Sequence, residues 1–214
     1  LGAFVVKGPE NLSYQQMLYI SEFVQNAINE TVSGGDASKL IDVDSCVAVW
    51  AINEFSKNID WGASSAYYYL PSNSDEHLNH VLYAGPVWDF DASFGIRNEI
   101  PEASDPLGTC FPSAHLPQTW FTKNPEVSKE AARVLAEDLA SAIEWVLGDN
   151  EGEYRTLNEL VTEIRESQRM NQVLWGLTSF DNCNPPKPTF EENVEFLRSW
   201  LEVRLAWVRG QYGL

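Results

Sequence analysis

Two carboxylates stand two positions apart in the stretch "GPVWDFDASFG", residues 85–95. Asp89 and Asp91 lie among apolar residues, where an ionised side chain needs a partner because burying an unpaired charge is costly. A divalent cation is one such partner, and carboxylate oxygens are ligands that Mg²⁺ accepts. Taken singly, each aspartate also suits a loop cap or an ion pair. The spacing therefore indicates a metal site and leaves these simpler roles open.

A third acid, Asp60, follows a predicted helix in the stretch "KNID". A predicted hairpin separates Asp60 from Asp89 and would bring both chain ends close together. The order of helix, acid, hairpin and second acid followed by Phe and Gly is typical of protein-kinase-like enzymes. In these enzymes the first acid orients or deprotonates the attacking hydroxyl, and the second holds Mg²⁺ on the nucleotide phosphates. Alone, Asp60 equally suits an Asx turn.

The elements that would position these acids are mostly helical. Apolar residues at helical spacing, with capping boxes that open the first and last helices at Ser13 and Thr189, predict five helices. They span about residues 13–32, 44–57 (with Asp44 as N-cap), 125–147, 154–176 and 189–212. The Tyr-rich segment 58–70 and the segment 80–90 predict a β-hairpin, and residues 95–119 read as a long loop. We expect an α+β, mostly α-helical fold with a small central hairpin, in one domain over residues 1–214.

The charge balance excludes some partners. Acidic residues outnumber basic ones 31 to 14, for a net charge of −17. Such a surface repels phosphate backbones and anionic lipids, so we expect no nucleic-acid or membrane partner. It attracts cations, although many secreted proteins are equally acidic. The three cysteines Cys46, Cys110 and Cys183 lack zinc-site spacing, and one disulfide among them is left open.

Two long segments resemble the CotH family, the atypical kinases first known from bacterial spore coats. They are "IDVDSCVAVWAINEFSKNIDWGASSAYYYL" and "LYAGPVWDFDASFG". Downstream, "TWFTKNPEVSKE" and "TFEENVEFLRSWLEVRLAWV", with its closing R-x-x-W, are also similar, so the resemblance covers nearly the whole chain. It implies a divergent protein-kinase-like C-terminal lobe. The implied activity is transfer of the γ-phosphate of ATP to serine or threonine hydroxyls of a protein substrate, with Mg²⁺ or Mn²⁺.

The resemblance implies roles for particular residues. Asp60 would be the catalytic acid/base that receives the hydroxyl proton, and Asp89 the main Mg²⁺ ligand. Asp91 would be a second ligand or support the first. Trp88 would line the nucleotide pocket, where its ring stacks on adenine, or alternatively is a core tryptophan.

Three further positions are less clearly defined. Protein kinases carry a metal-binding Asn five residues after the catalytic Asp, and Ser65 stands there in this chain. Asn58 is a substitute for that amide, or a helix C-cap. Arg97 would contact phosphate or substrate, or else pair with Glu99 or Glu102.

The region before the first helix departs from the kinase pattern. It has no glycine-rich strand–turn–strand, and Lys7 is the sole nearby lysine. We therefore expect this chain to be a C-terminal lobe that binds ATP weakly by itself. Two alternatives remain: a non-catalytic pseudokinase or surface or spore-coat binding module, and a glycoside hydrolase that uses Asp60 with Asp89. The resemblance favours a spore coat, cell-surface or secreted location over the cytoplasm.

Overall fold

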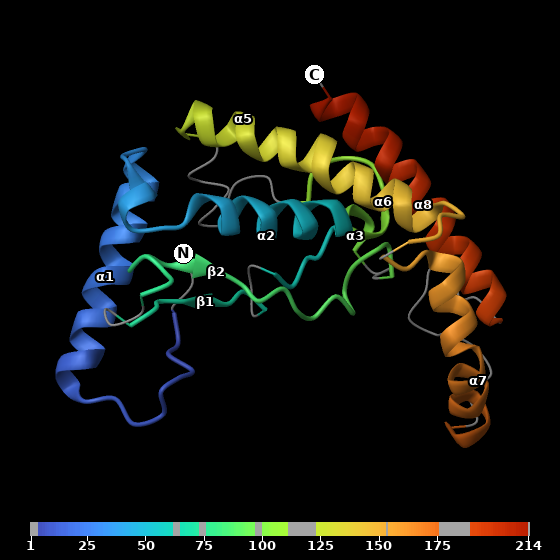
Figure 1. The fold of residues 1–214 in the computed structure, drawn as a ribbon, viewed down its shortest axis with the longest axis horizontal. Helices are drawn as coiled ribbons and strands as arrows, with labels where there is room; N and C mark the ends of the chain where they lie inside the picture. Colours follow the sequence, from blue (N-terminus) through green and yellow to red (C-terminus); the bar gives the residue numbers. More distant parts are fainter. Residues whose placement is uncertain are drawn as a thin grey trace. The chain divides into compact units, whose positions relative to one another are not determined.

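The computed structural model describes residues 4–61, 65–72, 76–96, 100–110, 123–152, 154–175 and 189–213. Their elements, in chain order, are the helices α1 (Tyr14–Ser33), the short 3₁₀ helix η1 (Ala37–Lys39) and α2 (Val43–Ser56), then the strands β1 (Tyr68–Tyr69) and β2 (Tyr83–Ala84) (Figure 1). The helices α3 (Pro101–Ser104), α5 (Pro125–Arg133), η2 (Val134–Leu139), α6 (Ala140–Leu147), α7 (Leu157–Trp175) and α8 (Phe190–Tyr212) follow. This confirms an α+β fold that is mostly helical. The likeness to a kinase C-terminal lobe stays a prediction.

The chain forms two compact units. The first comprises residues 1–50, 60–88 and 111–131, and the second comprises residues 51–59, 89–110 and 132–214. The helices α2 and α5 contribute residues to both units. The expectation of a single domain over residues 1–214 stays a prediction.

In the first unit the predicted β-hairpin is confirmed, but it is short. Tyr68 lies opposite Ala84 and Tyr69 opposite Tyr83 in an antiparallel pair. A parallel bridge between Ile41 and Leu82 continues the pairing. The strand β2 ends at Ala84, and Pro86 two positions later has no N–H to donate to a ladder. The Tyr69 and Tyr83 rings stack with centroids 5.1 Å apart, and such cross-strand aromatic pairs stabilise a two-stranded sheet.

The start of α2 corrects one sequence prediction. The Asp42 Oδ1 atom accepts the Ser45 N–H at 2.8 Å, so Asp42 caps a helix that begins at Val43. The prediction that Asp44 is the N-cap is wrong, because Asp44 already lies inside the first turn. There its negative charge is still favourable, since it faces the positive end of the helix dipole.

In the second unit α8 packs against α6 and η2 (Figure 1). The predicted capping box is confirmed, because the Glu192 N–H donates to the Thr189 hydroxyl at 3.2 Å and the Thr189 N–H donates to the Glu192 carboxylate at 3.0 Å. The face that α8 buries combines four apolar side chains with one cation: Trp200, Leu201, Arg204, Leu205 and Val208. The helical run predicted over 125–147 is confirmed, and η2 is a π-helical segment within it.

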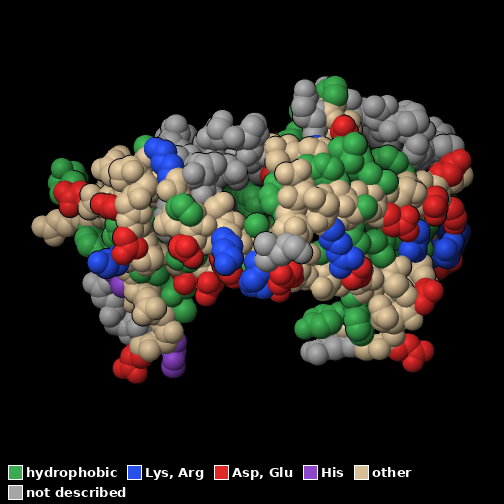
Figure 2. All heavy atoms as spheres, turned by 90° about the horizontal axis from the view of Figure 1, so that it is seen from above, with side chains coloured by type: hydrophobic (Ala, Val, Ile, Leu, Met, Phe, Trp, Pro, Cys, Tyr) green, Lys and Arg blue, Asp and Glu red, His purple; other side chains and the backbone are tan. Residues whose placement is uncertain are grey.

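The surface carries both signs of charge. Figure 2 shows Asp and Glu side chains together with Lys and Arg on the face in view. Some of the basic residues form ion pairs at the surface, such as Arg165 with Glu191 and Arg133 with Asp138. Among the described residues, none of the helices combines the length and the apolar character needed to cross a membrane. Cys46 and Cys110 are free thiols, and Cys183 lies outside the described residues.

Candidate functional site

The two acids of "WDFDASFG" lie on a turn after β2, which we call the acidic turn (residues 89–96). Asp89 has φ +65°, in the left-handed region that Asp tolerates better than most residues. Both Asp89 and Asp91 are exposed to solvent. Inside the turn the buried Ser93 hydroxyl donates a hydrogen bond to the Phe90 carbonyl. The turn thus presents two carboxylates outward from a backbone that its own polar groups stabilise.

The acidic turn is attached to the end of α2. The Asn58 Nδ2 atom donates to the Asp89 carbonyl at 3.1 Å, and the Phe94 N–H donates to the Ser56 carbonyl at 2.7 Å. The same Asn58 amide donates to the Asn53 Oδ1 atom at 3.0 Å. These bonds attach both Asp89 and Phe94 to the C-terminal end of α2.

The other side of the acidic turn rests on α8. Gly95 has φ +80°, and a Cβ atom built there would lie 2.6 Å from both Cδ1 and Nε1 of Trp200. The Phe94 ring meets the Trp200 ring edge-on, with centroids 5.9 Å apart. The Trp200 Nε1 atom donates to the Ser104 carbonyl at 3.0 Å, which fixes the indole. Only glycine combines this backbone conformation with so close an approach.

The end of α2 is a Schellman motif with an unusual residue at its left-handed position. The Asn58 N–H donates to the Asn53 carbonyl at 3.0 Å, and the Lys57 N–H to the Glu54 carbonyl at 3.3 Å. Lys57 has φ +52°, where glycine is the usual choice. Asn58 therefore supplies a capping N–H, as its sequence position suggested, while its side chain bonds to the acidic turn.

Three of the other predicted residues, Asp60, Ser65 and Trp88, lie in the first unit. Asp60 is half-buried, and its carbonyl accepts the Ser65 N–H at 3.2 Å. Ser65 itself is buried. Trp88 is 53% exposed and meets the Tyr67 ring edge-on at a centroid distance of 5.8 Å, so it is not the core tryptophan of the alternative interpretation.

The predicted convergence of carboxylates spans both units. Asp60 belongs to the first unit, and Asp89 and Asp91 belong to the second. Within the described residues, no three His, Cys, Asp or Glu side chains form a group that could hold a metal ion. The gathering of the three aspartates around one metal stays a prediction. Arg97 lies outside the described residues.

The second unit contains a buried arginine that the sequence patterns do not predict. The Arg204 guanidinium is fully buried and donates to the carbonyls of Phe55 (3.0 Å), Pro106 (3.0 Å), Gly108 (2.6 Å) and Glu54 (2.6 Å). It also donates to the Glu54 carboxylate at 3.1 Å, so each of its five N–H groups has a partner. The guanidinium lies 4.6 Å from the Trp207 ring centroid, which explains the R-x-x-W spacing.

Lys57 adds a second cation to this group. Its Nζ atom donates to the carbonyls of Asp105 at 2.8 Å and Leu107 at 2.6 Å. Four consecutive carbonyls, 105 to 108, thus alternate between Lys57 and Arg204. The segment after α3 is held to α2 and α8 through its backbone.

Burial shifts the ionisation of this group. Burial lowers the pKa of Lys57, and the nearby Arg204 charge lowers it further. Burial also raises the pKa of the Cys110 thiol to about 12, with a contribution from Glu54, whose carboxylate accepts the Cys110 N–H at 2.8 Å. Glu54, Lys57 and Arg204 are buried and Cys110 is half-buried, so we assign these groups to the framework that holds the end of α2, from which the acidic turn is anchored.

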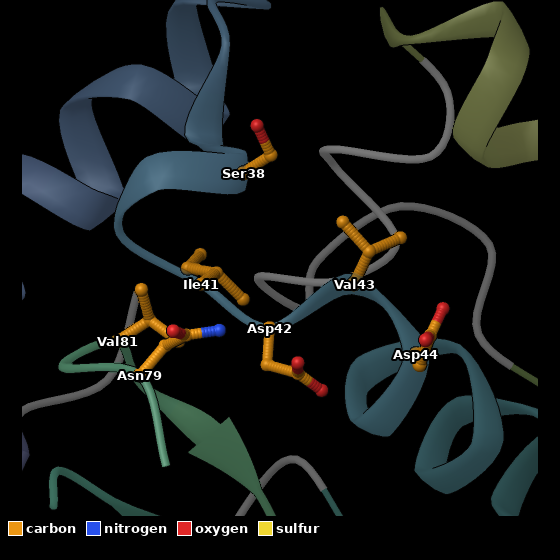
Figure 3. A pocket seen from close by; sticks show the side chains of 7 residues that line it. All are labelled: Ser38, Ile41, Asp42, Val43, Asp44, Asn79 and Val81. Atoms are coloured by element: carbon orange, nitrogen blue, oxygen red, sulfur yellow. The ribbon is translucent and has the colours of Figure 1, made fainter. Parts of the chain in front are cut away.

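A pocket in the first unit lies at the start of α2 (Figure 3). Its lining residues are Ser38, Ile41, Asp42, Val43, Asp44, Asn79 and Val81. The Asp42 carboxylate already caps α2, and Asp44 occupies its first turn. The acidic character of this pocket therefore follows from the needs of a helix N-terminus.

Comparison with known proteins identifies a family. No significant match to a curated protein was found, and none to a solved structure. A family model described as "CotH kinase protein" matches residues 6–208, which is most of the chain and includes the acidic turn, α2 and α8. The chain therefore belongs to the CotH kinase family.

Proposed function

We propose that this protein is an atypical kinase of the CotH type that transfers the γ-phosphate of ATP to serine or threonine hydroxyls of a protein. The observation that carries the proposal is the family match over residues 6–208, which includes both acid-bearing segments. The anchoring of the acidic turn to α2 and α8 supports it, because phosphoryl transfer depends on the exact placement of charged groups.

The chemistry of the acidic turn fits a hard divalent cation. Asp89 and Asp91 offer exposed carboxylate oxygens, which suit Mg²⁺ or Mn²⁺ because these ions keep several water ligands when they bind proteins. Asp89 would be the main ligand, with Asp91 and Ser65 as further candidates. When bound, the metal supplies positive charge that offsets the charge of the nucleotide phosphates.

The protein's own residues supply the remaining roles. Asp60 accepts the proton of the substrate hydroxyl as that hydroxyl attacks. The exposed Trp88 ring offers a stacking surface for adenine, held by its edge contact with Tyr67. Arg97, just after the acidic turn, contacts a phosphate group or the substrate.

Phosphate transfer from labelled ATP tests the proposal. The full-length protein is incubated with [γ-³²P]ATP, Mn²⁺ or Mg²⁺ and a mixed serine/threonine acceptor such as casein. We expect labelling of protein serine or threonine, confirmed by mass spectrometry. Asp60→Ala and Asp89→Asn should each lower the rate by at least about 100-fold, since each removes a group needed in the transition state.

A matched control separates the site from general charge effects. Asp149 is exposed and accepts a hydrogen bond from Asn158 at 2.8 Å, a bond that asparagine also accepts. Asp149→Asn should therefore keep the full rate. Labelling that persists in both site variants would refute the assigned roles. Nucleotide binding without any transfer, in the wild type, would instead indicate a pseudokinase.

A further inference from the structure

Asn58 connects two segments that the proposed function assigns to catalysis. Its side chain is fully buried, which is unusual for asparagine. It stands two positions before Asp60 in the sequence, and its Nδ2 atom donates to the Asp89 carbonyl at 3.1 Å. A buried amide is retained where its hydrogen bonds are needed, because an apolar residue otherwise packs at lower cost.

The bond acts on the backbone of Asp89. With φ +65°, Asp89 is in a conformation that costs about 1 kcal/mol or more for a residue other than glycine. The Asn58 amide can donate to the Asp89 carbonyl only when that carbonyl faces the end of α2. The hydrogen bond therefore favours the backbone conformation of Asp89 that gives its carbonyl this orientation. The Asn53 Oδ1 atom accepts from the same Nδ2 group at 3.0 Å and so fixes the amide plane.

Two further contacts restrain the far end of the acidic turn. The Phe94 N–H bonds to the Ser56 carbonyl, and Gly95 packs against Trp200. These contacts restrain residues 94 and 95, which lie five and six positions after Asp89. The hydrogen bond from Asn58, in contrast, is made directly to Asp89.

We propose that Asn58 is a positioning residue that holds Asp89 in its left-handed conformation and so directs the Asp89 carboxylate toward a divalent cation. This inference rests on the proposed function. It differs from the role of metal ligand that the sequence left open for Asn58, because here the amide acts through the Asp89 backbone and touches neither metal nor substrate.

The first test measures the turn without any activity. Hydrogen exchange is followed by mass spectrometry in peptides that cover residues 89–96, for the wild type, Asn58→Ala and Asn58→Asp. Asn58→Asp has nearly the same shape and cannot donate when ionised, so it tests the bond if the alanine variant does not fold. We expect exchange in these peptides to be about tenfold faster in either variant, which corresponds to one lost hydrogen bond. Exchange that stays at the wild-type rate overturns the inference.

The second test measures the metal requirement of phosphate transfer. We expect Asn58→Ala to raise the Mn²⁺ concentration for half-maximal rate about tenfold, while the rate at saturating Mn²⁺ stays within about threefold of the wild type. A role in folding alone would lower the saturating rate and leave the half-maximal concentration unchanged, and that result would overturn the inference. The exposed Asn158, which also donates a side-chain amide bond in this unit, provides the control variant Asn158→Ala.

The two proposals fail in different ways. If the wild type transfers no phosphate and binds neither Mn²⁺ nor Mn²⁺ with a non-hydrolysable ATP analogue, the proposed function is wrong and the metal-directing role falls with it. If the wild type is active and Asp89→Asn is inactive, but Asn58→Ala keeps the wild-type Mn²⁺ dependence, the positioning role alone is wrong.

Discussion

Replacement of Arg204 by methionine should destabilise the second unit strongly. Methionine keeps much of the side-chain length and lacks all five N–H groups. The change therefore removes the donors to the carbonyls of Glu54, Phe55, Pro106 and Gly108 and leaves the Glu54 carboxylate without this cation. Both side chains of the ion pair are at most 1% exposed, so water does not replace the lost partner.

The magnitude follows from this burial. Breaking a buried ion pair by removal of one partner costs about 3–5 kcal/mol, because the remaining charge stays desolvated. A typical domain has a free energy of unfolding of about 5–15 kcal/mol, so the loss is a large share of the total. Replacing Glu54 by methionine as well removes the stranded charge, and the double variant should be less destabilised than the sum of the two single variants.

Urea unfolding followed by tryptophan fluorescence measures these differences. Arg209→Met serves as the control, because Arg209 lies on the same helix and pairs with Glu144 at the exposed surface. Its unfolding midpoint should stay close to that of the wild type. A loss below about 1 kcal/mol for Arg204→Met, or strict additivity in the double variant, would show that the buried pair does not stabilise this unit as reasoned from its burial.

Two further changes test the acidic turn and a buried thiol. Gly95→Ala places a Cβ atom 2.6 Å from Trp200 at a residue in the left-handed conformation. We therefore expect the free energy of unfolding to fall by about 1–3 kcal/mol and phosphate transfer to become slower. Wild-type values for both quantities in a folded variant would contradict the packing argument. Burial raises the pKa of the Cys46 thiol to about 12, so between about pH 9 and pH 12 the unfolded chain loses a proton that the folded chain keeps. The free energy of unfolding then falls as pH rises, by up to about 1.4 kcal/mol per pH unit for each such thiol, and Cys46→Ala should make this fall shallower. Urea midpoints at pH 8 and pH 10.5 measure the difference, and equal slopes for the two proteins would refute it.

The helices and their caps are the part of this fold that the sequence predicts well. Capping boxes at Ser13 and Thr189 are local, so three or four residues suffice to recognise them, and both are confirmed. The start of α2 shows the limit of this reasoning. Asp42 and Asp44 are both good caps by type, and the choice depends on which carboxylate reaches the Ser45 N–H.

The buried charges could not be predicted in the same way. Charged residues are rarely buried, so nothing in the local pattern indicates that Glu54, Lys57 and Arg204 are buried. Their partners are mostly backbone carbonyls from segments about 50 to 150 positions away, which no local pattern reveals. The R-x-x-W spacing was the one sequence feature that pointed to Arg204, and the structure explains it by the contact of Arg204 with the Trp207 ring.

For the catalytic candidates, too, local features could be predicted from the sequence and contacts between distant residues could not. The sequence predicts a returning strand over residues 80–90 with the acids at its end, and the structure has a shorter strand, β2, with the acidic turn after it. The function of Asn58 was left between two roles because its side-chain partner, the Asp89 carbonyl, is distant in sequence. The gathering of Asp60, Asp89 and Asp91 stays a prediction that the kinase assay addresses.

The alternating carbonyls of residues 105 to 108 have a consequence for how this segment responds to change. The hydrogen bonds from Lys57 and Arg204 to this segment are made to its backbone carbonyls, so they depend on the spacing of the peptide groups. Exchanging Leu107 for another residue leaves that spacing intact. Deleting one residue would instead shift the carbonyls, so that Lys57 and Arg204 would each face a different peptide group. We therefore expect this segment to tolerate a substitution at Leu107 far better than a deletion.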